Sequence, residues 1–217
     1  MKFDTLSTRY TGGIAAGYEA ERTIAPQWAK EQAVTERFLA TLPAGATILD
    51  VPVGTGRFLE FYKKFGLVPT GLDISPDMLA SAKAKAAALG LDIKLAQGDI
   101  RRLDAADKSF EAALCVRFVN WIDFAGMEAV LRELSRVARS TLIVSVRVWP
   151  TPRTFSQRLG QGWTNFRRRK SELNFHNTEA TEALFGRLGF VIADSETVFR
   201  KSNQTSYVFY LLHRKPA

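Results

Sequence analysis

The chain has 217 residues, of which 46% are hydrophobic and 24% are charged, a balance that excludes a disordered chain and allows one sizeable core. It has no apolar run of the roughly 18 residues that span a bilayer and no apolar signal core. Its single cysteine, Cys115, excludes an internal disulfide and a multi-cysteine zinc site. The net charge is +8. Because the chain has one cysteine and no signal core, we expect a cytoplasmic protein, and we expect no metal centre.

Apolar periodicity predicts an alternation of helices and strands along the first two thirds of the chain. An amphipathic helix within 24–42 precedes the first strand, at 46–51. Helix 57–65, strand 68–73 and a helix from Pro76 to about residue 89 follow, the last with Ser75 as its cap and Gly90 as its stop. Further strands are expected at 92–96, 110–116 and 142–148, with a helix at 124–138 between the last two.

The end of the chain predicts an antiparallel hairpin, because strands 190–199 and 205–213 are joined by a short polar segment. Repeated strand–helix units imply a parallel sheet with helices on both faces. We therefore expect one domain over 1–217 with a Rossmann-like doubly wound α/β fold. Its seven strands would be mostly parallel, with an antiparallel strand in the terminal hairpin.

Polar side chains follow four of the predicted strands, at the point where each strand ends. These residues are Asp50, Asp73, Asp99 and Arg117. Open parallel sheets bind ligands beyond the carboxyl ends of their strands. The sequence therefore predicts a ligand site at this edge of the sheet.

The loop Gly54-Thr55-Gly56 would let the backbone approach a ligand closely, although a plain tight turn is the alternative. Asp73 follows Gly56 by 17 residues, a spacing at which an acid binds a ribose diol, and its alternative role is a helix-cap partnership with Ser75. Leu59 stands where a dinucleotide fingerprint needs a third glycine, and no phosphate-gripping P-loop pattern is present. The loop therefore favours a nucleoside without a pyrophosphate.

Three segments together resemble the class I S-adenosylmethionine (SAM)-dependent methyltransferases, and among them the ubiquinone-biosynthesis-like branch. They are Leu49-Asp50-Val51-Pro52-Val53-Gly54-Thr55-Gly56, Gly71-Leu72-Asp73-Ile74-Ser75-Pro76-Asp77-Met78-Leu79 and Gly98-Asp99-Ile100. The resemblance implies SAM as cofactor. Pro52 departs from it, because the family usually has a glycine there and proline removes a backbone donor.

The resemblance also implies roles for individual residues. Asp50 and the segment Pro52, Gly54, Thr55 and Gly56 would cradle the methionine moiety, and Asp73 would bind the ribose. The adenine would lie among Ile74, Met78, Asp99 and Ile100, while Cys115, Val116 and Arg117 would face the methionine end and the substrate. The alternative for Cys115, which lies on an apolar strand, is that it is a small buried core residue.

One further segment is a candidate for closing the site, and one further residue is a candidate for its chemistry. The N-terminal helical segment, 1–44, would act as a lid that brings Tyr18 and Arg22 to the cofactor; the alternative is a mobile terminus. His176 is a candidate general base, with a helix-capping or solvent-exposed histidine as the alternative.

Residues 149–177 form an expected insertion on the substrate side of the domain. Between Arg147 and Lys170 the chain has seven basic residues and no acidic one, and aromatic residues are interleaved with them. This pattern favours an anionic partner, which would be a small molecule, a nucleic acid or an anionic lipid. The alternative is a surface helix with a basic solvated face.

The sequence leaves three functional hypotheses. The first is a methyltransferase that acts on a small-molecule acceptor, for which an anionic or aromatic metabolite is one candidate. The second is an RNA-modifying or RNA-binding protein that uses the basic insertion. The third is a SAM-binding partner protein without catalysis, which Pro52 and the lack of an evident base permit.

Overall fold

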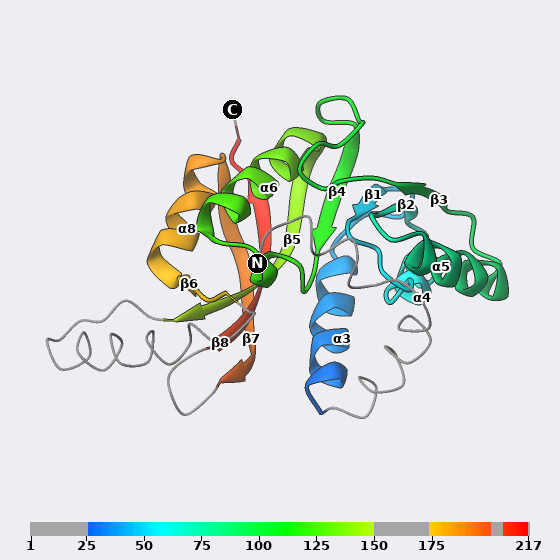
Figure 1. The fold of residues 1–217 in the computed structure, drawn as a ribbon, viewed down its shortest axis with the longest axis horizontal. Helices are drawn as coiled ribbons and strands as arrows, with labels where there is room; N and C mark the ends of the chain where they lie inside the picture. The colour runs from blue at the N-terminus through cyan, green and yellow to red at the C-terminus, as the bar shows by residue number, and fades with distance from the viewer. Residues whose placement is uncertain (1–25, 150–173, 201–205, 217) are drawn as a thin grey trace, which may run out of the picture.

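The computed structural model describes residues 26–149, 174–200 and 206–216, which form one twisted sheet covered by helices (Figure 1). The strand order is β3-β2-β1-β4-β5-β8-β7, and β6 pairs with β5 beside this path. The strands are β1 (Thr47–Asp50), β2 (Val68–Asp73), β3 (Lys94–Gln97), β4 (Phe110–Cys115), β5 (Ala138–Trp149), β6 (His176–Asn177), β7 (Phe190–Arg200) and β8 (Ser206–Arg214).

Strands β1 to β6 pair in parallel, whereas β8 is antiparallel to both β5 and β7. The predicted fold class, including its antiparallel terminal hairpin, is confirmed. Strand order reverses between β1 and β4, and such a switch point opens a crevice at the carboxyl ends of the strands.

Helices cover both faces of the sheet (Figure 1). The side chains of α6 (Phe124–Val137) and α8 (Thr178–Arg187) pack on one face, where Leu49 and Val144 point. The side chains of α3 (Pro26–Leu39), α4 (Leu59–Lys64) and α5 (Pro76–Leu89) pack on the other, where Ile48 and Ile143 point. Because successive strand residues face opposite layers, β1 and β5 need continuous apolar runs.

The helix ends follow the predicted local chemistry. The Ser75 side chain accepts a hydrogen bond from the Met78 amide, and Gly90 ends α5 in the left-handed conformation with φ 61°. Asp123 caps α6 and Asn177 caps α8 in the same way. The sequence analysis assigned no element to α8, although Asn177 followed by an apolar residue pattern was a usable start signal.

The expected insertion at 149–177 is described only at its two ends. β5 runs to Trp149, β6 begins at His176, and residues 150–173 lie outside the described residues. The two ends are joined, because Val148 and Trp149 pair with His176 and Asn177, and the rings of Trp149 and Phe175 stack with centroids 6.4 Å apart.

Candidate functional site

A pocket lies beyond the carboxyl ends of β1, β2 and β4, beside α3. Eight of the residues that line it were predicted site residues: Pro52, Gly54, Thr55, Asp73, Ile74, Met78, Val116 and Arg117. Six others were not predicted: Trp28, Val53, Arg57, Phe58, Phe118 and Trp121.

The two glycines of the predicted loop have different roles. Gly54 has φ 57°, and a Cβ built on it would meet no atom within 4 Å, because this residue faces the pocket. Gly56 has φ 81°, and its Cβ would lie 2.6 Å from Leu59 Cδ1 and 3.3 Å from Ala82 Cα. Gly56 is therefore required for the packing of α4 against α5 and does not line the pocket. The bulk of Leu59 fills the space beside it.

Asp73 is tied to both neighbouring backbone segments. Its Oδ2 accepts a hydrogen bond from the Gly54 amide at 2.9 Å, and its Oδ1 accepts one from the Ser75 amide at 2.9 Å. Burial raises the pKa of Asp73, and these amide hydrogen bonds oppose the rise. The interaction of Asp73 with Ser75 that was predicted as the alternative role is therefore present. A carboxylate oxygen has two lone pairs, so each oxygen can still accept a bond from a ligand hydroxyl.

Asp50 lies behind the pocket lining and is buried. Its Oδ2 accepts a hydrogen bond of 2.8 Å from the Tyr62 hydroxyl. Burial raises the pKa of Asp50 to about 7, the Tyr62 hydrogen bond opposes that rise, and the charge of Asp73 adds to it. The carboxyl group therefore changes charge near neutral pH.

Three other predicted cofactor residues also lie outside the lining. Asp99 makes an ion pair with Arg101, and the hydrogen bonds from Arg101 lower the pKa of that carboxyl. Ile100 and Cys115 belong to the apolar core, and burial strongly raises the pKa of the Cys115 thiol. The structure therefore places Cys115 as a buried apolar residue.

The backbone of Arg117 is held in an unusual conformation by three neighbouring side chains. Its backbone has φ 61°, which is rare for a residue with a side chain. The amide donates to Ser145 Oγ at 2.8 Å, the carbonyl accepts from Trp121 Nε1 at 3.1 Å, and Ser145 in turn lies 2.7 Å from the Tyr207 hydroxyl. These bonds hold a strained conformation at the end of β4.

Glu31 of α3, which the sequence analysis missed, connects Arg117 with Arg57. Its Oε2 lies 2.7 Å from Arg117 Nε and 2.8 Å from Arg57 Nη1, and its Oε1 lies 2.5 Å from Arg117 Nη2. Glu31 is 1% exposed. No local signal identified this triad, because its members come from three separate elements.

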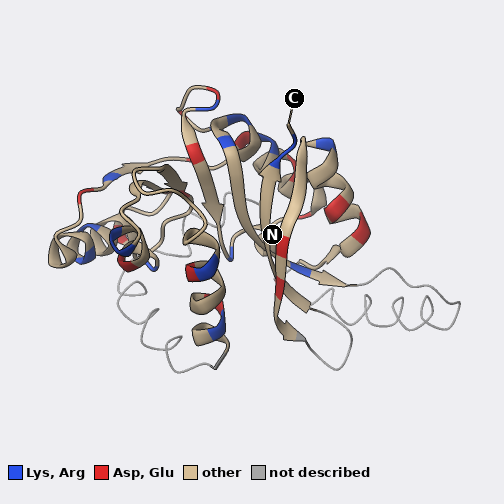
Figure 2. Cartoon of the chain, turned by 180° about the vertical axis from the view of Figure 1, so that it is seen from behind, with Lys and Arg blue, Asp and Glu red and all other residues tan. Residues whose placement is uncertain are grey.

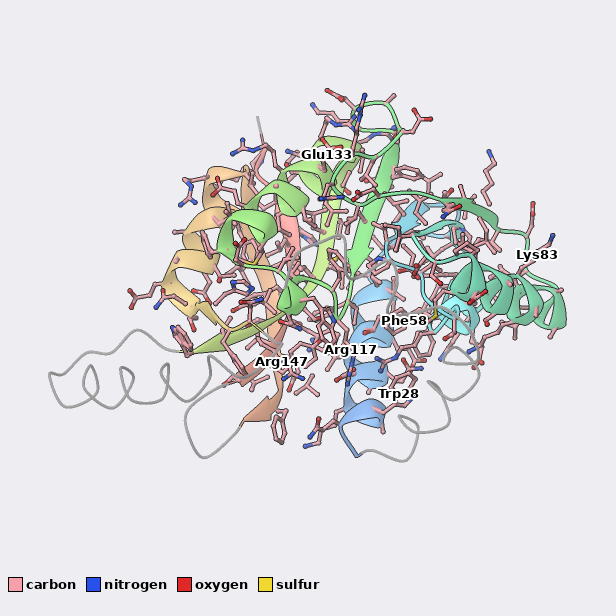
Figure 3. The ribbon with its side chains drawn as sticks, in the orientation of Figure 1. Trp28, Phe58, Lys83, Arg117, Glu133 and Arg147 are labelled. Carbon is pink, nitrogen blue, oxygen red and sulfur yellow. The ribbon has the colours of Figure 1, made fainter. Side chains whose placement is uncertain are left out.

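Aromatic side chains form much of the remaining wall. The guanidinium carbon of Arg57 lies 3.5 Å from the ring centroid of Trp28, and Phe58, Phe118 and Trp121 also line the pocket. Figure 3 shows Trp28 on α3 and Phe58 beside that helix, with Arg117 and Arg147 nearby at the same end of the sheet. The pocket thus combines apolar walls with a cationic end.

His176 does not line the pocket. It is buried in β6 with Nε2 3.1 Å from the Val119 carbonyl oxygen, and its ring lies 6.1 Å from that of Phe124. Burial lowers its pKa, which favours the neutral imidazole. The neighbouring Asn177, rather than His176, caps the following helix.

Two predictions fall outside the described residues: Tyr18 and Arg22 of the expected lid, and residues 150–170 of the basic segment. In the part that the structure describes, α3, α5 and α8 each have both basic and acidic residues (Figure 2). Within those same ranges, no helix is long and apolar enough to cross a bilayer, and no group of three His, Cys, Asp or Glu side chains could hold a metal ion.

The doubly wound sheet, with a pocket at its switch point, belongs to the Rossmann-like class of folds. Residues 48–141 match a family model described as a methyltransferase domain. This match confirms the predicted resemblance of the segment to the class I SAM-dependent methyltransferases, and the resemblance extends to the ubiquinone-biosynthesis-like branch.

Curated relatives align over the same part of the chain. A malonyl-[acyl-carrier protein] O-methyltransferase of Pectobacterium atrosepticum is 36% identical over 106 residues, which cover 48% of this chain and 40% of the relative. A ubiquinone/menaquinone biosynthesis C-methyltransferase of Bdellovibrio bacteriovorus is 37% identical over 98 residues, which cover 44% and 41%. The chain thus spans less than half the length of these relatives.

Solved structures extend the likeness to nearly the whole fold. A geranyl diphosphate methyltransferase in complex with SAM superposes with a TM-score of 0.70 at 16% identity, covering 95% of this chain and 92% of the other. At that identity the similarity concerns the fold alone. The methyl acceptors named for these relatives differ in chemistry, so kinship says little about the acceptor.

Proposed function

We propose that the protein is an enzyme that transfers the methyl group of SAM to a small-molecule acceptor. The observation that carries this proposal is the bridge from the Gly54 amide to Asp73 and Ser75, which fixes a carboxylate at the pocket wall. Two oxygens held this rigidly suit the two hydroxyls of a ribose. The family of residues 48–141 supports the same donor.

The adjoining residues fit the rest of a nucleoside. Ile74 and Met78 offer an apolar surface next to Asp73, where an adenine ring would pack. Gly54 leaves open space at the loop, and Pro52 and Thr55 continue the lining toward Arg117. The methionine end would therefore point toward the aromatic and cationic part of the pocket, where the acceptor would lie.

Methyl transfer from SAM requires few catalytic side chains. SAM supplies an activated methyl group on a sulfonium, so the protein has to align the acceptor in line with that methyl and exclude water. The apolar walls formed by Phe118, Trp121 and Val116 serve both purposes. We place no general base, since His176 lies outside this lining. The aromatic walls and the two arginines support an acceptor that is aromatic or anionic.

Isothermal titration with SAM and its demethylated product tests the donor site. The wild type should bind both in the micromolar range, and Asp73→Ala should bind at least about tenfold more weakly, because a ribose loses two charge-assisted hydrogen bonds. Asp92→Ala removes an exposed acid as the matched control. Equal binding by the Asp73 variant and the wild type, with both folded by circular dichroism, would refute this site.

A further inference from the structure

Asp50 is a buried carboxyl group directly behind the wall of the donor pocket. It ends β1, the strand beside the switch point of the sheet, and it is 1% exposed. Pro52 and Gly54, which follow it in the chain, line the pocket, whereas Asp50 does not. A charge that enters the pocket therefore acts on Asp50 across this wall, where little water screens the interaction.

Three ionisable side chains face Asp50 from the elements packed around β1, and none of them is a cation. They are Tyr62 of α4, Asp73 at the end of β2 and Cys115 of β4. The Tyr62 hydroxyl donates to Asp50 Oδ2 at 2.8 Å, and no lysine, arginine or histidine in the described part of the chain forms an ion pair with this carboxyl. Burial raises the pKa of both Tyr62 and Cys115, so both are neutral near pH 7. These neighbours thus give an ionised Asp50 one hydrogen bond and no opposite charge.

Asp73, the other acid at this edge of the sheet, is held differently. Two backbone amides, those of Gly54 and Ser75, donate to its oxygens, each at 2.9 Å. Amide donors favour the charged form of a carboxyl group, so Asp73 keeps its charge more readily than Asp50 does. The charge of Asp73 in turn disfavours a second negative charge at Asp50. Of the two acids, Asp50 is therefore the one whose charge a ligand can change near neutral pH.

The methyl donor and its product differ by one charge at the sulfur atom. SAM has a sulfonium, whereas its demethylated product has a neutral thioether, and the two molecules are otherwise alike. In the proposed pose the ribose binds Asp73, and the methionine end runs past Pro52 and Thr55. The sulfur, which joins these two parts, then lies along the wall that covers Asp50. A cation at that place favours the ionised carboxyl, because opposite charges attract strongly where water is excluded.

We propose that Asp50 makes the pocket select SAM over its demethylated product by ionising when the sulfonium is bound. The carboxyl releases its proton to solvent as SAM binds, and it takes up a proton from solvent once the methyl group has left and the sulfur is neutral. The product then lies against an uncharged wall and dissociates more readily than SAM. This inference rests on the proposed function, because it requires SAM in this pocket.

Calorimetric titration with SAM and with its demethylated product at pH 6, pH 7 and pH 8 tests this selection. The ratio of the two affinities should rise with pH in the wild type, because only SAM binding releases the proton of Asp50. With a free-protein pKa of about 7, a tenfold greater acidity of Asp50 in the SAM complex corresponds to about a fivefold rise in this ratio between pH 6 and pH 8. At pH 7, titrations in two buffers of different ionisation enthalpy should show that SAM releases about 0.4 proton more than the product does.

Three variants assign the effect to Asp50. Asp50→Asn is neutral at every pH, so its affinity ratio should change only through the amino groups of the ligands themselves, and the wild-type rise is measured against it. Tyr62→Phe removes the hydroxyl that stabilises the ionised carboxyl, so in this variant the rise should move to higher pH. The exposed Asp92→Asn should behave like the wild type.

The outcomes distinguish this inference from the proposed function. The role of Asp50 would be overturned, even though SAM binds, by a wild-type ratio that follows that of Asp50→Asn, by equal proton release with both ligands, or by an unshifted profile in Tyr62→Phe. If Asp50→Asn does not fold, the Tyr62→Phe profile and the proton release still decide. A wild type that binds neither ligand at any of the three pH values would overturn the proposed function itself, and this inference with it.

Discussion

Replacement of Asp50 by Asn should stabilise the protein, and more so at high pH. The pKa of Asp50 is about 7 in the folded state, against 3.8 for an unperturbed side chain, because burial penalises its charge. An acid with a raised folded-state pKa loses stability as pH rises from the unfolded pKa to the folded one, since only the unfolded chain releases its proton there. Asn keeps an oxygen that can accept the Tyr62 hydrogen bond and carries no charge.

The magnitude follows from the two pKa values. Relative to a neutral side chain of equal shape, Asp50 lowers the free energy of unfolding by about 4 kcal/mol at pH 8 and by about 2 kcal/mol at pH 5. Urea unfolding, followed by tryptophan fluorescence, should therefore give a gain for Asp50→Asn that is about 2 to 3 kcal/mol larger at pH 8 than at pH 5.

The exposed Asp92→Asn is the control and should show no such difference. A gain that is the same at both pH values, or a loss at pH 8, would refute the assignment of a strained charge at Asp50.

Three further predictions address the site. Gly56→Ala should destabilise the protein by about 2–4 kcal/mol, because of its left-handed backbone and its clash with Leu59. Gly54→Ala should cost only about 1 kcal/mol of stability and should mainly weaken binding of the demethylated product of SAM. If urea unfolding showed Gly54→Ala to be the more destabilising variant, the two roles would be contradicted. Glu31→Ala should cost about 3 kcal/mol because it leaves Arg57 and Arg117 without their shared acid. Removal of the half-buried Glu36, which pairs with the exposed Lys64, should change stability by less than about 1 kcal/mol in Glu36→Ala. His176→Gln should leave methyl transfer unchanged. Its free energy of unfolding should fall less steeply than that of the wild type below about pH 6.5, because there His176 binds a proton in the unfolded wild type, whereas burial lowers the pKa of the folded-state imidazole and keeps it neutral. A large loss of turnover at unchanged stability would identify His176 as a catalytic residue after all.

Local patterns in the sequence determined most of the fold. The apolar run at Ile48 and Leu49 needs burial on both faces, and Ser75 and Gly90 mark the ends of α5 by hydrogen bonding and by a left-handed backbone. These signals depend on residues close together in the chain, so periodicity and capping rules recover them. No helix was predicted at α8, although Asn177 supplies its N-terminal cap.

The same local reasoning placed Asp73, Gly54 and Arg117 at one edge of the sheet, since parallel strands bring their carboxyl ends together. It could not separate Gly54 from Gly56. That distinction depends on which atoms lie beside each Cβ, and Leu59 and Ala82 reach Gly56 only when α4 packs on α5.

Only the tertiary structure decided the acid that holds the pocket's cationic end. Glu31 lies 86 residues from Arg117, on a helix whose sequence reads as an ordinary charged surface. Its burial between two guanidiniums arises because α3 lies beside the strand ends, and no spacing rule connects residues that meet only through the packing of separate elements. The sequence thus determined the sheet and the donor side of the pocket, and the packing of α3 determined its charged side.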